Sequence, residues 1–131
     1  MSKEQTPATL PMQWVERIFH KLTLIYGRDF TRRWDGMPLE EVKQDWAEEL
    51  GRFAGQGEAI RYALEHVPDD RPPTVRAFAR LCDVWVARQH MKRAQAFMAM
   101  GKLDEAGKSL DKAGEVLAAP PGKPVLREVA A

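Results

Sequence analysis

The spacing of apolar residues along the chain predicts α-helices and no strand. From residue 11 to residue 26, apolar side chains recur at steps of three and four, which gathers them on one helical face. Pro11 suits the first turn of this helix, because its missing N–H has no intrahelical partner there. Gly27 suits the end of the helix, because glycine accepts a positive φ, and a short helical turn is expected at residues 30–34.

Two further helices are predicted in the middle of the chain. The first opens at Pro38, and the second, which is shorter, ends at Pro68. Residues 71–73, with the sequence Arg-Pro-Pro, must be extended, because each proline disfavours helical geometry in the residue before it. Thr74 is then the expected N-cap of the next helix.

The C-terminal part of the chain predicts an αα-hairpin over residues 87–118, with Gly101 as its hinge. Apolar residues of the last helix alternate at steps of three and four, which is typical of a coiled-coil seam too short to stand alone. The hairpin either packs on the domain or projects from it, and a projecting hairpin exposes this seam to a partner. The seam residues are Leu103, Ala106, Leu110, Ala113 and Leu117.

The predicted fold class is all-α, a small helical domain of four to five helices with a C-terminal αα-hairpin. The 131 residues fit one compact domain, and a domain of that size needs no metal or disulfide to be stable. We expect residues 1–10 to be a disordered N-terminus, residues 11–88 the helical domain, residues 89–118 the hairpin extension and residues 119–131 a disordered tail.

The composition is that of an ordinary globular protein, with 44% hydrophobic and 30% charged residues. The one cysteine, Cys82, excludes an internal disulfide and fits a reducing compartment. The first residues lack the apolar run of a signal peptide, and no stretch is long and apolar enough to span a membrane. We therefore expect a soluble, cytoplasmic protein without a membrane partner.

Charge is unevenly distributed, although the net charge is only +1. Residues 35–70 contain ten acidic and three basic side chains, whereas residues 71–102 contain seven basic side chains and one acidic side chain. A net charge this close to zero argues against a general nucleic-acid coat protein. The basic segment either packs against the acidic one or makes a local contact with phosphates or an acidic partner.

The sequence contains no recognisable catalytic or metal-binding motif. His20, His66 and His90 lie in different predicted helices without a neighbouring cysteine, so their spacing is not that of metal ligands, and we expect them to be solvated. Cys82 lies on an apolar stripe, where a buried and unreactive thiol is expected. The acidic residues between positions 40 and 49 fit a solvated helix face, with an acidic docking surface as the alternative.

Residues 39–83 read as a helix with a tryptophan, a second helix that ends in Ala-Leu, a proline-rich loop and a helix with an aromatic residue followed by Leu-Cys. The features are Trp46, Ala63-Leu64, Pro72-Pro73-Thr74, Phe78 and Cys82. This block resembles the replication protein P family of lambdoid phages, whose members load a bacterial replicative helicase. In those loaders the C-terminal part is implicated in grasping the helicase, and the resemblance does not extend to residues 90–131.

The resemblance implies that the chain binds the replicative helicase and holds its ring open through differential affinity, without hydrolysing anything. We therefore predict a phage or prophage DNA-replication accessory protein with no enzymatic activity and no cofactor. A replication initiator protein and single-stranded DNA are further partners to consider. Two alternatives stay open: a helical adaptor or inhibitor with a non-helicase partner, and a DNA-binding protein that uses residues 71–102.

The candidate partner-binding residues are basic side chains of the long helix and apolar side chains of the hairpin. The hairpin's methionines fit either a core or an adaptable binding groove. A second copy of the chain, docked through the hairpin, is a further candidate partner. The candidate residues are Arg76, Arg80, Arg88, Lys92, Arg93, Met98, Leu103, Leu110 and Leu117.

Overall fold

The computed structural model describes residues 9–118, and every regular element in this part of the chain is a helix, which confirms the all-α prediction. Six α-helices occur, because Arg28–Thr31 forms a separate turn in addition to the five longer helices. The predicted disordered termini lie largely outside the described residues. The elements are α1 (Met12–Tyr26), α2 (Arg28–Thr31), the 3-10 helix η2 (Arg32–Trp34), α3 (Leu39–Glu49), the 3-10 helix η3 (Gly51–Phe53), α4 (Gly57–Glu65), α5 (Val75–Ala99) and α6 (Leu103–Ala118).

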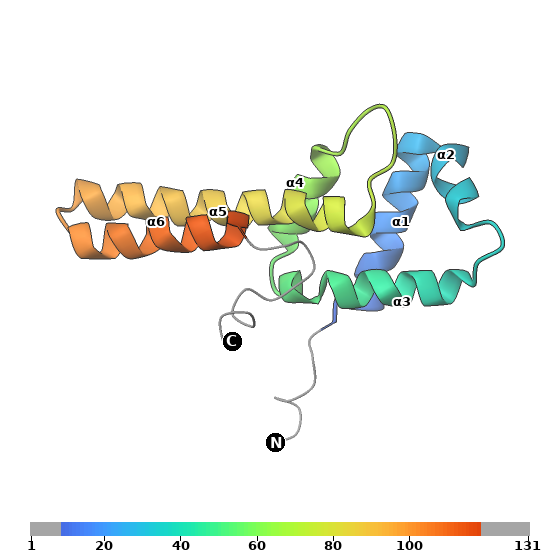
Figure 1. Ribbon diagram of the computed structural model, residues 1–131, viewed down its shortest axis with the longest axis horizontal. Coiled ribbons are helices and arrows are strands. Elements are labelled where there is room, and N and C mark those ends of the chain that lie inside the picture. Colours follow the sequence, from blue (N-terminus) through green and yellow to red (C-terminus); the bar gives the residue numbers. More distant parts are fainter. Residues whose placement is uncertain (1–8, 119–131) are drawn as a thin grey trace, which may run out of the picture.

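The long helix α5 belongs to two parts of the molecule. Figure 1 shows its first half packed in a domain with α1, α3 and α4, and its second half running beside α6 away from that domain. Thr74 caps the helix as predicted, since its Oγ1 accepts a hydrogen bond from the Ala77 N–H at 3.1 Å. Gly101 makes the turn into α6 with a φ of +78°. The hairpin therefore projects from the domain.

The folded domain begins before α1. Leu10, which was predicted to lie in a disordered N-terminus, is only 2% exposed. Its backbone N–H donates to the Ala47 carbonyl in α3 at 2.9 Å. An apolar residue just before a helix commonly packs against the first turns of that helix. The predicted boundary at residue 11 is therefore wrong for Leu10, which is part of the core.

Aromatic side chains connect the helices of the domain. The ring of Phe19 in α1 lies 5.2 Å from Phe30 and 5.1 Å from Trp46, both edge-to-face, and stacks on Trp34 at 6.1 Å between centroids. Trp46 in turn lies 5.8 Å from Phe78 in α5. Such ring pairs add to the free energy gained from area burial alone, so this chain of rings fixes α5 against the rest of the domain.

Most of the residues that carry the resemblance are explained by this packing, whereas Leu64 is half-buried and Thr74 is the exposed N-cap of α5. Trp46, Ala63, Phe78 and Cys82 are at most 2% exposed, and the two prolines of residues 72–73 are buried as well. Side chains in such positions determine a fold and do not contact a partner directly.

A buried ion pair also connects the domain to α5. Asp83 is 3% exposed, and it accepts two hydrogen bonds from Arg52 of η3, at 2.6 Å from Nη1 and 3.1 Å from Nη2. Burial raises the pKa of the Asp83 carboxyl, while the hydrogen bonds and charge of Arg52 act in the opposite direction. The pair is therefore costly to break from one side, because the remaining charge would be left without its partner.

We predict that Asp83→Ala lowers the free energy of unfolding by about 3 kcal/mol, because it leaves the Arg52 guanidinium without its carboxylate in a largely buried site. Urea denaturation followed by circular dichroism measures this change. Asp111→Ala, at an exposed position of α6, is the matched control and should change stability by less than about 0.5 kcal/mol. Equal effects of the two substitutions would show that the buried pair does not hold α5 in place.

Candidate protein-binding face of the helical hairpin

Small side chains form the contact between α5 and α6. The buried residues of this seam are alanines and a serine, and short side chains at a helix–helix contact allow the two axes to come close together. Leucines at the same positions would hold the helices further apart. The buried small residues are Ala87 and Ala94 of α5 and Ala106, Ser109 and Ala113 of α6.

The predicted seam is therefore only partly right. Ala106 and Ala113 face α5 as expected, but the leucines do not. Leu103 is 67% exposed, Leu110 is 48% exposed and Leu117 is 50% exposed. Ser109 replaces Leu110 in the contact, because the alanines of α5 are matched closely only by another small side chain. The three leucines form the neighbouring line on the helix surface.

Exposed apolar residues of α5 lie on the same side of the hairpin as these leucines. Met98 and Leu110 each follow a buried alanine of the contact, Ala94 and Ala106, by four residues, and four residues along a helix turn the side chain by about 40°. In an antiparallel pair this step turns toward the same side from both helices. We call the resulting surface the Leu/Met face. It consists of Met91 (45% exposed), Met98 (53% exposed), Leu103, Leu110 and Leu117.

Two glycines alternate with the leucines along α6. Leu103, Gly107, Leu110, Gly114 and Leu117 are separated by steps of four and three, which keeps them on one line of the helix. A Cβ added at either glycine would meet no atom within 4 Å. Glycine inside a helix costs about 1 kcal/mol relative to alanine, so these residues have no explanation in the packing of the described chain. Leucines separated by bare backbone form a surface that another helix can approach closely.

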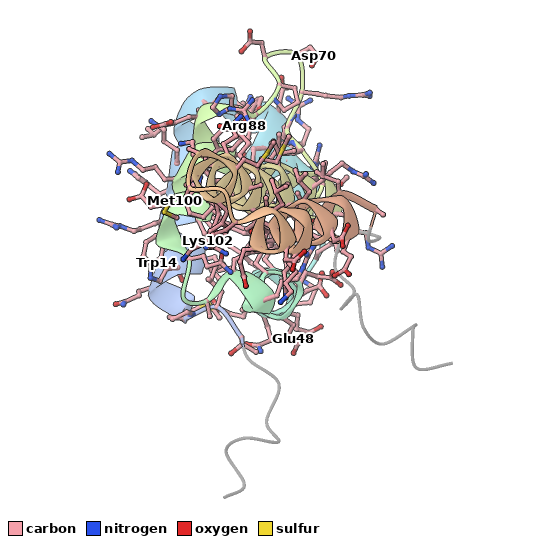
Figure 2. All side chains as sticks on the ribbon, turned by 90° about the vertical axis from the view of Figure 1, so that its left-hand side faces the viewer. Trp14, Glu48, Asp70, Arg88, Met100 and Lys102 are labelled. Atoms are coloured by element: carbon pink, nitrogen blue, oxygen red, sulfur yellow. The ribbon has the colours of Figure 1, made fainter. Side chains whose placement is uncertain are left out.

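The basic candidates do not gather on one face. All five are exposed, but at about 100° per residue they wind around α5, so Arg76 and Arg93 point in different directions. Arg88 lies over the ring of Tyr62 in α4, at 5.4 Å from the centroid. Figure 2, which looks along the hairpin, shows Arg88 on one side of α5 and Met100 on another. Lys92 and Arg80 follow the same winding, so the five side chains form no single stripe.

The structure thus brings together the apolar candidates and separates the basic ones. Met98, Leu103, Leu110 and Leu117 share the Leu/Met face, together with Met91. The two glycines were not among the predicted site residues. Their alternation with leucine at a seven-residue spacing is visible in the sequence and is the signal that would have identified them.

The residues predicted to be unreactive or solvated can be located in the structure. In residues 9–118 no three His, Cys, Asp or Glu side chains gather as metal ligands. Cys82 is fully buried as predicted, and burial raises the pKa of its thiol, which disfavours the nucleophilic thiolate. His20 and His66 are exposed, whereas His90 is half-buried, and its pKa is lowered by desolvation and by Arg93 and Lys112.

Comparisons with protein-family models, with curated proteins and with solved structures find no match to this chain. Among the described helices, none combines the length and apolar character that crossing a bilayer requires.

We predict that the double substitution Gly107→Ala and Gly114→Ala stabilises the isolated chain by about 2 kcal/mol, since each alanine gains about 1 kcal/mol of helix propensity and meets no obstacle. Thermal and urea denaturation of the purified protein measure this gain. Ala99→Gly, at an exposed position near the end of α5, makes the opposite change and is the control, which should lower the stability. A loss of stability in the alanine variant would mean that the glycines serve the fold of the chain itself.

Proposed function

We propose that this protein is a non-catalytic binding protein that docks a helical segment of a partner protein on the Leu/Met face. The observation that carries the proposal is the line of half-exposed leucines and open glycines on α6. Burying the exposed part of one leucine contributes on the order of 1 kcal/mol. Three leucines and two methionines on one side of a projecting hairpin supply enough apolar area for a helix-in-groove contact.

The partner that we propose is a bacterial replicative helicase. The resemblance of residues 39–83 to the phage replication protein P family supports this identification. In those loaders the C-terminal part is implicated in grasping the helicase, and the Leu/Met face also lies towards the C-terminal end, at residues 91–117, which the resemblance does not cover. In this proposal the domain is a scaffold that holds α5 and the projecting hairpin in place.

The mechanism requires differential affinity and no chemistry. A protein that binds the open helicase ring more tightly than the closed ring shifts the population toward the open form. A tenfold preference corresponds to about 1.4 kcal/mol, which is within reach of two or three buried leucines. The proposed role therefore requires neither a reactive thiol nor a bound metal. In the described residues Cys82 is buried, and no three His, Cys, Asp or Glu side chains gather as metal ligands.

We predict that Leu110→Glu combined with Leu117→Glu reduces retention of a purified bacterial replicative helicase at least tenfold. Two carboxylates on the Leu/Met face would have to lose their hydration in the contact. Both side chains are about half exposed, so the fold of the chain should persist. Leu24→Glu is the matched control, because Leu24 is an exposed leucine of α1, 68% accessible and distant in the chain from the hairpin.

Size-exclusion chromatography of mixtures with light scattering reads out both the helicase complex and self-association. Retention of the helicase by the wild type and Leu24→Glu, but not by the hairpin variant, supports the proposal. Equal retention by all three proteins would place the helicase site elsewhere. The wild type could instead form a dimer that does not bind the helicase and that the hairpin substitutions dissociate. That result would identify a second copy as the occupant of the face and overturn the helicase proposal.

A further inference from the structure

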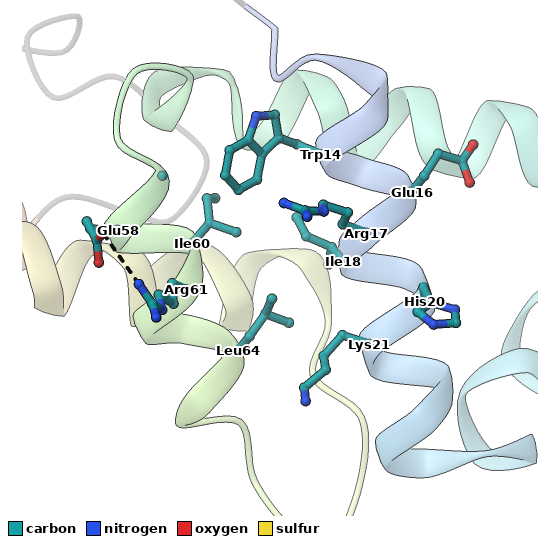
Figure 3. A pocket seen from close by; sticks show the side chains of 11 residues that line it. Trp14, Glu16, Arg17, Ile18, His20, Lys21, Glu58, Ile60, Arg61 and Leu64 are labelled. Carbon is teal, nitrogen blue, oxygen red and sulfur yellow. Dashed lines mark ion pairs between the residues drawn. The ribbon is translucent and has the colours of Figure 1, made fainter.

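A second apolar surface lies in the domain, in a groove between α1 and α4. The groove has a volume of about 760 Å³ and a floor of four apolar side chains, two from each helix. Ile18 and Ile60 are at most 1% exposed, whereas Trp14 and Leu64 are half-buried. Figure 3 shows these side chains converging on the space between the two helices. None of them belongs to the Leu/Met face.

Gly57 shapes one end of this groove. A Cβ at Gly57 would lie 3.0 Å from Cη2 of Trp14, closer than side-chain carbons normally approach. The absence of a side chain at this position therefore lets the indole ring lie against the first turn of α4. The ring then closes the end of the groove and presents an apolar wall to a ligand.

The two sides of the groove differ in charge. On α1, Arg17 and Lys21 lie one turn apart, both are exposed, and within residues 9–118 neither has a carboxylate within 4.0 Å. On α4, Arg61 is compensated by Glu58 at 3.6 Å and by Glu65 at 3.8 Å. The groove thus has an apolar floor, one positive wall and one neutralised wall.

Glu16 does not neutralise the positive wall. Although Glu16 lines the groove, its Oε1 accepts a hydrogen bond from Nζ of Lys43 in α3 at 3.0 Å. Figure 3 shows its carboxylate directed away from Arg17 and Lys21. The guanidinium of Arg17 instead lies 5.8 Å from the centroid of the Trp14 ring. The positive charge and the apolar floor are therefore adjacent at this end of the groove.

We infer that this groove binds an acidic amphipathic helical segment of a protein. Such a helix places apolar residues at steps of three and four on the floor and carboxylates on the side of Arg17 and Lys21. The α1 side of the groove, from Trp14 to Lys21, rises by about 10 Å or two helical turns, and its positive charges lie about 6 Å apart along the helix axis. A nucleic acid fits poorly, because the opposite rim carries Glu58 and the floor is apolar.

The inference goes beyond the proposed function, because the groove and the Leu/Met face are built from different helices. With both surfaces, one chain can hold two partners at once. The hairpin docks one partner through apolar contact, and the domain holds a second through charge and apolar contact together. Opposite charges across a contact mainly set specificity and the rate of association, so binding in the groove should weaken as salt is raised.

Two synthetic peptides of about four helical turns test this inference. They share the same leucines at steps of three and four, and one carries glutamates on its polar face where the other carries lysines. Binding to the full chain is measured by fluorescence anisotropy and located by ¹⁵N chemical-shift changes. We expect the glutamate peptide to bind at least tenfold more tightly than the lysine peptide, and to shift amides of α1 and α4.

The double substitution Arg17→Glu and Lys21→Glu should lower the affinity of the chain for the glutamate peptide at least tenfold. Arg28→Glu combined with Arg32→Glu is the matched control, because both arginines are exposed and lie outside the groove. The hairpin variant of Leu110 and Leu117 should bind the glutamate peptide like the wild type, which separates this test from that of the proposed function. No binding of the glutamate peptide, equal binding of the lysine peptide, or shifts confined to α5 and α6 would each overturn the inference.

Discussion

The contact of small side chains between α5 and α6 determines what the hairpin presents to its surroundings. Because Ala94, Ala106 and Ala113 fill the seam, the two helices need no large side chain to pack together. The leucines of α6 are then left on the flank, where about half or more of each side chain stays exposed. Had Leu110 been placed in the seam, the same composition would have formed an ordinary buried hairpin without an apolar face.

This seam has an effect only because α5 is held firmly by the domain. The capped start at Thr74, the ring contact of Trp46 with Phe78 and the ion pair of Arg52 with Asp83 all act on the first half of the helix. The second half continues as the same rigid element and carries α6 with it (Figure 1). The domain therefore supplies the position of the hairpin, and the hairpin supplies the surface.

The sequence was sufficient to predict the helices, the cap at Thr74, the turn at Gly101 and the burial of Cys82, because each depends on local chemistry or on periodicity. The sequence was not sufficient to predict which line of residues on α6 packs against α5. A spacing of three and four fits both the line through Leu110 and the adjacent line through Ser109, and hydrophobicity alone favours the leucine. The choice depends on the alanines of α5, which are known to face α6 only once the helices are placed.

The groove between α1 and α4 could not be predicted for a related reason. It depends on Gly57 and Trp14, which come from different helices and which no local pattern connects. The dispersal of the basic residues around α5 was, in contrast, within reach of the sequence, since Arg76 and Arg93 fall on different sides of any helix that continues through both. The resemblance rests mainly on buried residues such as Trp46 and Phe78, so it relates to the scaffold that holds α5.

Titration calorimetry with a purified bacterial replicative helicase is the most direct test of the central claim, comparing the wild type with the Gly107→Ala and Gly114→Ala variant. We predict that the variant binds at least tenfold more weakly although the chain alone is more stable, because the added methyl groups keep a partner helix away from α6. Unchanged or tighter binding by the stabilised variant would show that the glycines do not serve a partner.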